Sequence, residues 1–87
     1  MSAMTGHETT LQAIFRVPTR PVKYRAIESL LIAHGFEKDE GSGSRLRFCA
    51  DGGAYVLTLH KPHNGADAPP GLVRRIRAIL EKKGIKP

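Results

Sequence analysis

The sequence predicts an α+β domain in which a helix, a three-stranded antiparallel sheet and a second helix follow one another along the chain. Three observations predict it. Apolar residues recur at helical spacing in segments 22–34 and 71–83. Between these segments, residues 45–50 and 54–60 alternate apolar and polar side chains, as half-buried strands do. The Asp-Gly-Gly turn at 51–53 joins the two strands, so we expect them to form a β-hairpin.

Length and composition limit the class of protein. The 87 residues suffice for one hydrophobic core, and 40% hydrophobic with 25% charged residues is typical of a globular domain. The single cysteine, Cys49, excludes an internal disulfide and therefore the disulfide-stapled secreted class. The sequence has no apolar run of transmembrane length, and residues 1–10 do not resemble a signal peptide. We therefore expect a cytoplasmic protein with no membrane association.

Two prolines divide the chain into an N-terminal extension, 1–20, and a main domain, 21–87. The extension is expected to hold a short helix over residues 9–15, with its apolar residues on one side. Pro18 breaks the chain after it, and Pro21 suits the first turn of the helix that follows. The main domain is thus expected to begin with a helix at its first residues.

The remaining segments complete this architecture. Residues 36–39 are a weak candidate for the third strand, and 60–70 reads as a loop. Gly35 and Gly84 are expected to end the two main helices, with Ile85 folding back after the second. Packing both helices on one sheet face is the simplest compact solution. The other face would then be free for a partner. The side chains exposed on it would be those of Arg45, Arg47, Val56 and Thr58.

Positive charge is the unusual feature of the composition. Fourteen Lys and Arg oppose eight Asp and Glu, which gives a net charge of +6. The C-terminal segment 72–87 is especially basic, with Arg74, Arg75, Arg77, Lys82, Lys83 and Lys86. Such a balance favours a polyanionic partner such as a nucleic acid. The alternative is a solvated helix face followed by a basic tail.

The string His60-Lys61-Pro62-His63 is the most informative local feature. Histidine titrates near neutral pH, so His60 and His63 could act as general acid and base, and Lys61 could hold a phosphate. The alternative is a pair of ordinary surface histidines at a strand end. Zinc would need three or four ligands, and no further ligand sits at the usual spacing. We therefore predict no metal and no other cofactor.

The Gly-Ser-Gly-Ser run at 41–44 is a weak phosphate-binding candidate. It lacks the lysine of a P-loop, and a strand follows it where a P-loop has a helix. The backbone amides and the Ser44 hydroxyl could still contact one phosphate. The alternative is a strand connection that needs glycine.

Several motifs together resemble one family. Gly43-Ser44-Arg45, entering a strand, resembles the Gly-Ser-His motif of HicA (YcfA-like) toxins, small RNA-cleaving proteins of bacterial type II toxin–antitoxin pairs. Pro62-His63 is similar to that family's Pro-His step, segment 70–76 to its Gly-Thr-Leu/Val-x-x-Ile stretch, and segment 80–85 to its short final helix. The resemblance covers roughly residues 21–86 and is strongest to a variant branch.

This resemblance implies a fold, an activity and partners. The fold would be double-stranded-RNA-binding-domain-like, with the short N-terminal helix as an addition. The activity would be mRNA cleavage that inhibits translation, and a HicB-type antitoxin would neutralise it. One departure bears on this activity, because Arg45 stands where the family has its catalytic histidine. Arginine can bind a phosphate but stays protonated, so it cannot act as a general base at neutral pH.

A site hypothesis follows from this departure. RNA cleavage without a metal needs a base, an acid and positive charge near the phosphate. His60 and His63 would supply the acid and base if a bend at Pro62 brings them together. The RNA- or phosphate-binding residues would be Ser44, Arg45, Arg47, Lys61, Arg74, Arg75 and Arg77. The alternative is a non-catalytic domain of the same fold that binds RNA or an antitoxin.

Overall fold

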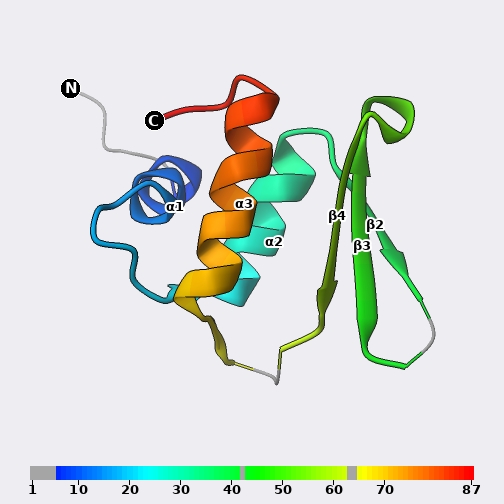
Figure 1. Ribbon diagram of the computed structural model, residues 1–87, viewed down its shortest axis with the longest axis horizontal. Coiled ribbons are helices and arrows are strands. Elements are labelled where there is room, and N and C mark those ends of the chain that lie inside the picture. The colour runs from blue at the N-terminus through cyan, green and yellow to red at the C-terminus, as the bar shows by residue number, and fades with distance from the viewer. Residues whose placement is uncertain (1–5, 42, 63–64) are drawn as a thin grey trace.

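The computed structural model describes residues 6–41, 43–62 and 65–87 (Figure 1). Three α-helices run over α1 (Gly6–Ile14), α2 (Tyr24–Ala33) and α3 (Pro70–Lys82). A three-stranded antiparallel sheet has the order β2–β3–β4, with β2 at Glu37–Glu40, β3 at Arg45–Ala50 and β4 at Tyr55–His60. A separate two-stranded pair consists of β1 (Val22–Lys23) and β5 (Asp67–Ala68). The expected α+β order of helix, three strands and helix is therefore confirmed.

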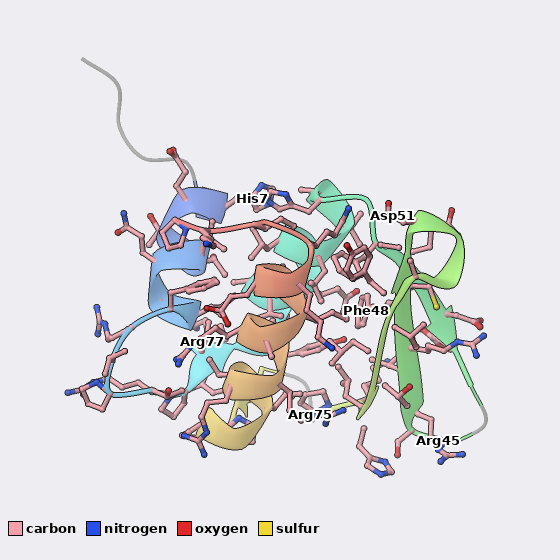
Figure 2. The ribbon with its side chains drawn as sticks, turned by 45° about the horizontal axis from the view of Figure 1, so that its top comes forward. His7, Arg45, Phe48, Asp51, Arg75 and Arg77 are labelled. Atoms are coloured by element: carbon pink, nitrogen blue, oxygen red, sulfur yellow. The ribbon has the colours of Figure 1, made fainter. Side chains whose placement is uncertain are left out.

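The sheet separates an apolar face from an open face. Side chains that point to the helices are almost fully buried: those of Leu46, Phe48, Ala50, Leu57 and Leu59. Phe48 is completely buried and lies between the helices and the sheet (Figure 2). The alternate residues of β3 and β4 face away from the helices and are mostly exposed. The predicted open face is thus present, and both main helices cover the opposite one (Figure 1).

The hairpin between β3 and β4 forms as the alternation predicts. Its register pairs Arg45 with His60 at one end and Ala50 with Tyr55 at the other. A tight turn at Asp51–Gly53 makes the connection. Asp51, Gly52 and Gly53 all adopt positive φ there, which is costly for most residues and explains the two glycines.

Glycines end both main helices, as expected. Gly35 has a φ of +89°, and the N–H of Phe36 donates back to the carbonyl oxygen of Leu31. After α3, the N–H of Ile85 donates in the same way to the carbonyl oxygen of Leu80. Both ends are Schellman motifs, in which glycine takes the left-handed conformation. Ile85 packs against the core, so its predicted return after the helix is confirmed.

The N-terminal helix α1 belongs to the same core. Leu11 and Ile14 are buried in it, and α1 contacts both α2 and α3 on the side away from the sheet (Figure 1). The guanidinium of Arg77 on α3 holds the following segment, because Nε donates to the carbonyl oxygen of Ile14 at 3.0 Å. Its Nη2 donates to the carbonyl oxygen of Arg16 and to the hydroxyl of Thr19. The extension is therefore docked on the main domain.

Three local expectations are wrong. The predicted short helix, 9–15, begins earlier, at Gly6, and ends at Ile14. Pro21 precedes the helix it was expected to start, because Val22–Lys23 pairs with Asp67–Ala68 as a small sheet. Because Asp67–Ala68 is the other strand of this pair, the segment 60–70, which was expected to be a loop, also contains a short strand. Two-residue strands are too short to produce an alternating pattern, so the sequence carries no sign of them.

Candidate phosphate-binding site

The open end of the β3–β4 hairpin brings together two of the predicted site residues. The N–H of Lys61 donates to the carbonyl oxygen of Ser44 at 2.6 Å, which makes these residues a hydrogen-bonded pair. Pairs alternate along an antiparallel ladder, so the adjacent Arg45 and His60 form a non-hydrogen-bonded pair. In such a pair the Cβ atoms lie about 4.5–5.5 Å apart on one face. Arg45 and His60 are both exposed on the open face, side by side.

Arg75 reaches the same end of the molecule from α3. Its Nη2 donates to the carbonyl oxygen of Thr58 on β4 at 2.5 Å. Figure 2 shows Arg75 and Arg45 at one end of the sheet and Asp51 at the other. We use the name hairpin-end cluster for five exposed residues that three segments of the chain bring together: Ser44, Arg45, His60, Lys61 and Arg75.

The hairpin-end cluster is strongly positive. Within the part of the chain that the structure describes, neither Arg45 nor Lys61 forms an ion pair. The acceptor of the Arg75 hydrogen bond is the neutral carbonyl oxygen of Thr58, so this bond does not offset the charge of the guanidinium. Arg45 and His60 share the open face, Arg75 lies at the outer edge of β4, and Lys61 lines the helix side near Glu28, so three cations and an imidazole surround this exposed end. Such a group matches a phosphodiester, whose oxygens accept charged hydrogen bonds.

Two predicted phosphate ligands are engaged elsewhere. Arg47 lies on the open face, but its Nη2 forms an ion pair with Asp39 of β2 at 2.8 Å. Arg77 is half-buried and directs its guanidinium to the segment after α1. Arg74 is exposed on α3. His63, the second predicted catalytic residue, lies outside the described residues, so the pairing of His60 with His63 stays a prediction.

A polar pocket beside Lys61 was not predicted. It has a volume of 460 Å³ and is lined by residues of α2, β2 and the segment after β4, among them Tyr24, Glu28, Lys38, Lys61 and Pro62. The Tyr24 hydroxyl is buried there and has no hydrogen-bond partner among the described residues. Burial, followed by the neighbouring Glu28 carboxylate, raises the pKa of Tyr24. The spacing of Tyr24 and Glu28, one helical turn apart, is the only sequence signal of this pocket.

An ion pair crosses this pocket from α2 to β2. Lys38 Nζ lies 2.9 Å from Glu28 Oε2. Partial burial works to raise the pKa of the Glu28 carboxyl, but the hydrogen bond from Lys38 and the nearby Tyr24 hydroxyl lower it overall. The hydrogen bond to Glu28 in turn raises the pKa of Lys38. This pair fixes the edge strand to the helix and leaves the open face unaffected.

Across residues 6–41, 43–62 and 65–87, no three His, Cys, Asp or Glu side chains gather as a set of metal ligands. Among the helices described, none has the length and apolar character needed to cross a bilayer.

The fold and this site define a class of protein: a small α+β domain with an open sheet face and a basic, imidazole-bearing end. A family model described as the HicA toxin of bacterial toxin–antitoxin systems matches residues 24–85. The chain therefore belongs to the HicA toxin family. Comparison with curated proteins and with solved structures gave no match.

Membership of this family gives the chain a biological setting. It is a toxin of a toxin–antitoxin system and has an antitoxin as partner. The matched region begins at the first residue of α2 and ends just after α3. Helix α1 and strand β1 therefore lie outside it, although α1 contributes Leu11 and Ile14 to the core.

Proposed function

We propose that this toxin binds RNA at the hairpin-end cluster and cleaves it there without a metal. The observation that carries the proposal is the facing pair of Arg45 and His60. Arginine supplies a permanent cation for a phosphate, and histidine supplies a group that exchanges protons near neutral pH. The resemblance puts the family's catalytic histidine on β3, at the position of Arg45. The imidazole of His60 lies directly across the ladder from that position.

The reaction that fits these groups is attack by a ribose 2′-hydroxyl. Its oxygen bonds to the adjacent phosphorus, and the bond from phosphorus to the 5′-oxygen breaks. The products are a 2′,3′-cyclic phosphate and a free 5′-hydroxyl. One group must accept the 2′-hydroxyl proton, and another must donate a proton to the leaving oxygen. Arg45 and Lys61 would stabilise the negative charge that builds on the phosphoryl oxygens.

His60 is the proton-exchanging group that the described residues supply to this site. As a neutral imidazole it would accept the proton, and as a cation it would donate one. We assign the second role to His63 on the sequence evidence, because Pro62 between the two residues constrains the segment. Ser44 would add a hydroxyl donor to the phosphate.

Charge on the sheet indicates the path of the RNA. The strand β2 carries Glu37 and Asp39 on the open face, and Asp39 neutralises Arg47. Phosphates are repelled from this edge. We therefore propose that the strand of RNA runs from Arg45 and Lys61 towards α3, where Arg74 and Arg75 are exposed. Single-stranded RNA suits an end of this kind because its phosphates are separately accessible.

A second candidate function is RNA binding without cleavage. The observation that favours it is Arg45 itself, which cannot serve as a general base. The hairpin-end cluster would then hold a phosphate next to an imidazole that performs no chemistry. The same mutants separate the two functions, because binding and cleavage are read independently.

The test is a cleavage assay on single-stranded RNA with a chelator present. It compares the natural protein with His60→Ala, His63→Ala and Arg45→Ala, and uses Arg16→Ala as a matched control, since Arg16 is exposed beyond α1. We expect cyclic phosphate ends from the natural protein and a loss of cleavage of about 100-fold or more in His60→Ala. Intact RNA in every sample, with binding retained, would support the non-catalytic alternative.

A further inference from the structure

The outer edge of β4 presents backbone groups to solvent. The bond from Lys61 N–H to the Ser44 carbonyl oxygen fixes which residues pair with β3. Because hydrogen-bonded pairs alternate along an antiparallel ladder, the backbone N–H and C=O groups of residues 55, 57 and 59 also bond to β3. The N–H and C=O groups of Val56, Thr58 and His60 therefore point away from the sheet, and β4 is an edge strand. Such an edge is a template for an added strand.

A groove lies beside the first half of this edge, at residues 54–57, between β4 and α3. Its volume is 340 Å³, and it is lined by residues that include Val56, Ala78 and Ile79 together with Arg75 and Lys82. Val56 is half-exposed, which is unusual for a large aliphatic side chain. The described lining holds two cations and no carboxylate. A ligand that fits must offer apolar side chains, negative charge and free backbone groups together.

We propose that this groove binds an acidic, extended segment of the antitoxin, which pairs with β4 as an added strand. This inference rests on the proposed function, because it explains how the partner silences that site. Alternate side chains of the added strand would cover Val56, and its carboxylates would meet Arg75 and Lys82. Main-chain hydrogen bonds to Val56, Thr58 and His60 would provide the affinity.

The groove favours a peptide over RNA. A nucleic acid has no backbone N–H and C=O pattern that matches a strand edge, and it gains little from Val56, Ala78 and Ile79. Arg75 has a second role in this arrangement. In the free protein its guanidinium occupies the Thr58 carbonyl oxygen and so covers the centre of the edge. Binding would release it to a carboxylate of the added strand, which replaces a neutral acceptor by a charged one.

The position of the edge makes the binding inhibitory. His60 is the last residue of β4, and its outward backbone groups are part of the same edge. A strand that extends to His60 would lie beside the imidazole and restrict access to the pair that it forms with Arg45. The antitoxin would thus occupy the hairpin-end cluster without having to imitate RNA.

The experiment uses the full chain labelled with nitrogen-15 and a defined probe. The probe is a capped peptide of about six residues, the usual length of a strand, with alternating valine and glutamate. Two control peptides replace glutamate by lysine or carry N-methyl groups on alternate amides. Amide hydrogen exchange of Val56, Thr58 and His60 is measured with each peptide. We expect slower exchange at these amides with the valine–glutamate peptide alone.

Variants of the edge sharpen the test. Val56→Pro removes an outward N–H, which is tolerated on an edge strand, and should weaken peptide binding about tenfold. Val56→Thr keeps the N–H and should bind within about threefold of the natural protein. Lys82→Glu should also weaken the peptide, by about threefold, and it changes no backbone group. It therefore remains informative if Val56→Pro fails to fold.

The outcomes separate this inference from the proposed function. Protection of the β4 amides by the valine–glutamate peptide supports the docking surface whether or not the protein cleaves RNA. Equal binding of the lysine or N-methylated peptide, or protection elsewhere on the chain, overturns it. Protection of the same amides by a single-stranded RNA, with none by the peptide, assigns the groove to RNA and also overturns it.

Discussion

Arg45 and His60 lie opposite each other on neighbouring strands, as a non-hydrogen-bonded pair on the exposed face of the sheet. This pairing places a permanent cation beside a titratable ring with no other residue between them. The Gly-Ser-Arg motif therefore need not mean a lost site. In the proposed site, His60 on β4 would supply the imidazole that the family has on β3, and Arg45 would hold the phosphate.

The first prediction concerns salt. Arg45→Ala removes an exposed cation from the hairpin-end cluster, so fewer counterions are released when RNA binds. We expect the affinity for single-stranded RNA to fall about tenfold, and the slope of log affinity against log salt to become shallower by about 0.7. Fluorescence anisotropy over a salt series measures both quantities. An unchanged slope in Arg45→Ala would place the phosphate contacts elsewhere.

The second prediction concerns Arg77. Its guanidinium donates to Ile14, Arg16 and Thr19, so Arg77→Ala leaves part-buried carbonyl oxygens without their donor. We expect the free energy of unfolding to fall by about 1–3 kcal/mol. Denaturant titration measures this change, and faster amide exchange in α1 should accompany it.

The matched control for Arg77 is Arg74→Ala on the same helix. Arg74 is exposed, so its replacement should change stability by less than about 0.5 kcal/mol. If Arg77→Ala instead leaves stability intact and weakens RNA binding, Arg77 is a phosphate ligand, as the sequence alone suggested.

The third prediction concerns acid. The carboxyl of Glu28 has a folded-state pKa below its ordinary value of 4.5, so its charged form stabilises the folded state. This contribution is complete above pH 4.5 and is lost as the pH falls through the lowered pKa. Unfolding measured between pH 6 and pH 3 should therefore show a steeper loss of stability in the natural protein than in Glu28→Gln. Glu37→Gln is the control, since Glu37 is exposed on β2. Parallel curves for the natural protein and Glu28→Gln would contradict the prediction.

The alternation of β3 and β4 is sufficient to predict both faces of the sheet, since every second residue must be buried. The same alternation is enough to assign Arg45 to the open face. The register that sets Arg45 beside His60 depends on the turn at Asp51–Gly53, whose positive φ at Asp51 the Asp-Gly-Gly signal does not specify. The hairpin-end cluster was therefore predictable in its members and only partly in its geometry.

Long-range side-chain contacts explain what the sequence did not predict. Arg77 falls on the polar side of its helix by periodicity, but α1 covers that side and turns the residue inward. The pair of Glu28 and Lys38 likewise depends on how β2 lies against α2. Neither contact has a local pattern, because the partners come from different elements. Composition and spacing report only on neighbours along one element.

The central claim is that Arg45 and His60 act on the same phosphate, and a double-mutant cycle tests it most directly. RNA affinity is measured for the natural protein, Arg45→Ala, His60→Ala and the double variant at one salt concentration. If both residues contact one phosphate, the effects are not additive, and the coupling free energy is about 0.5–3 kcal/mol. Additive effects, with a coupling below about 0.3 kcal/mol, would show that the two side chains bind RNA independently and would contradict the account.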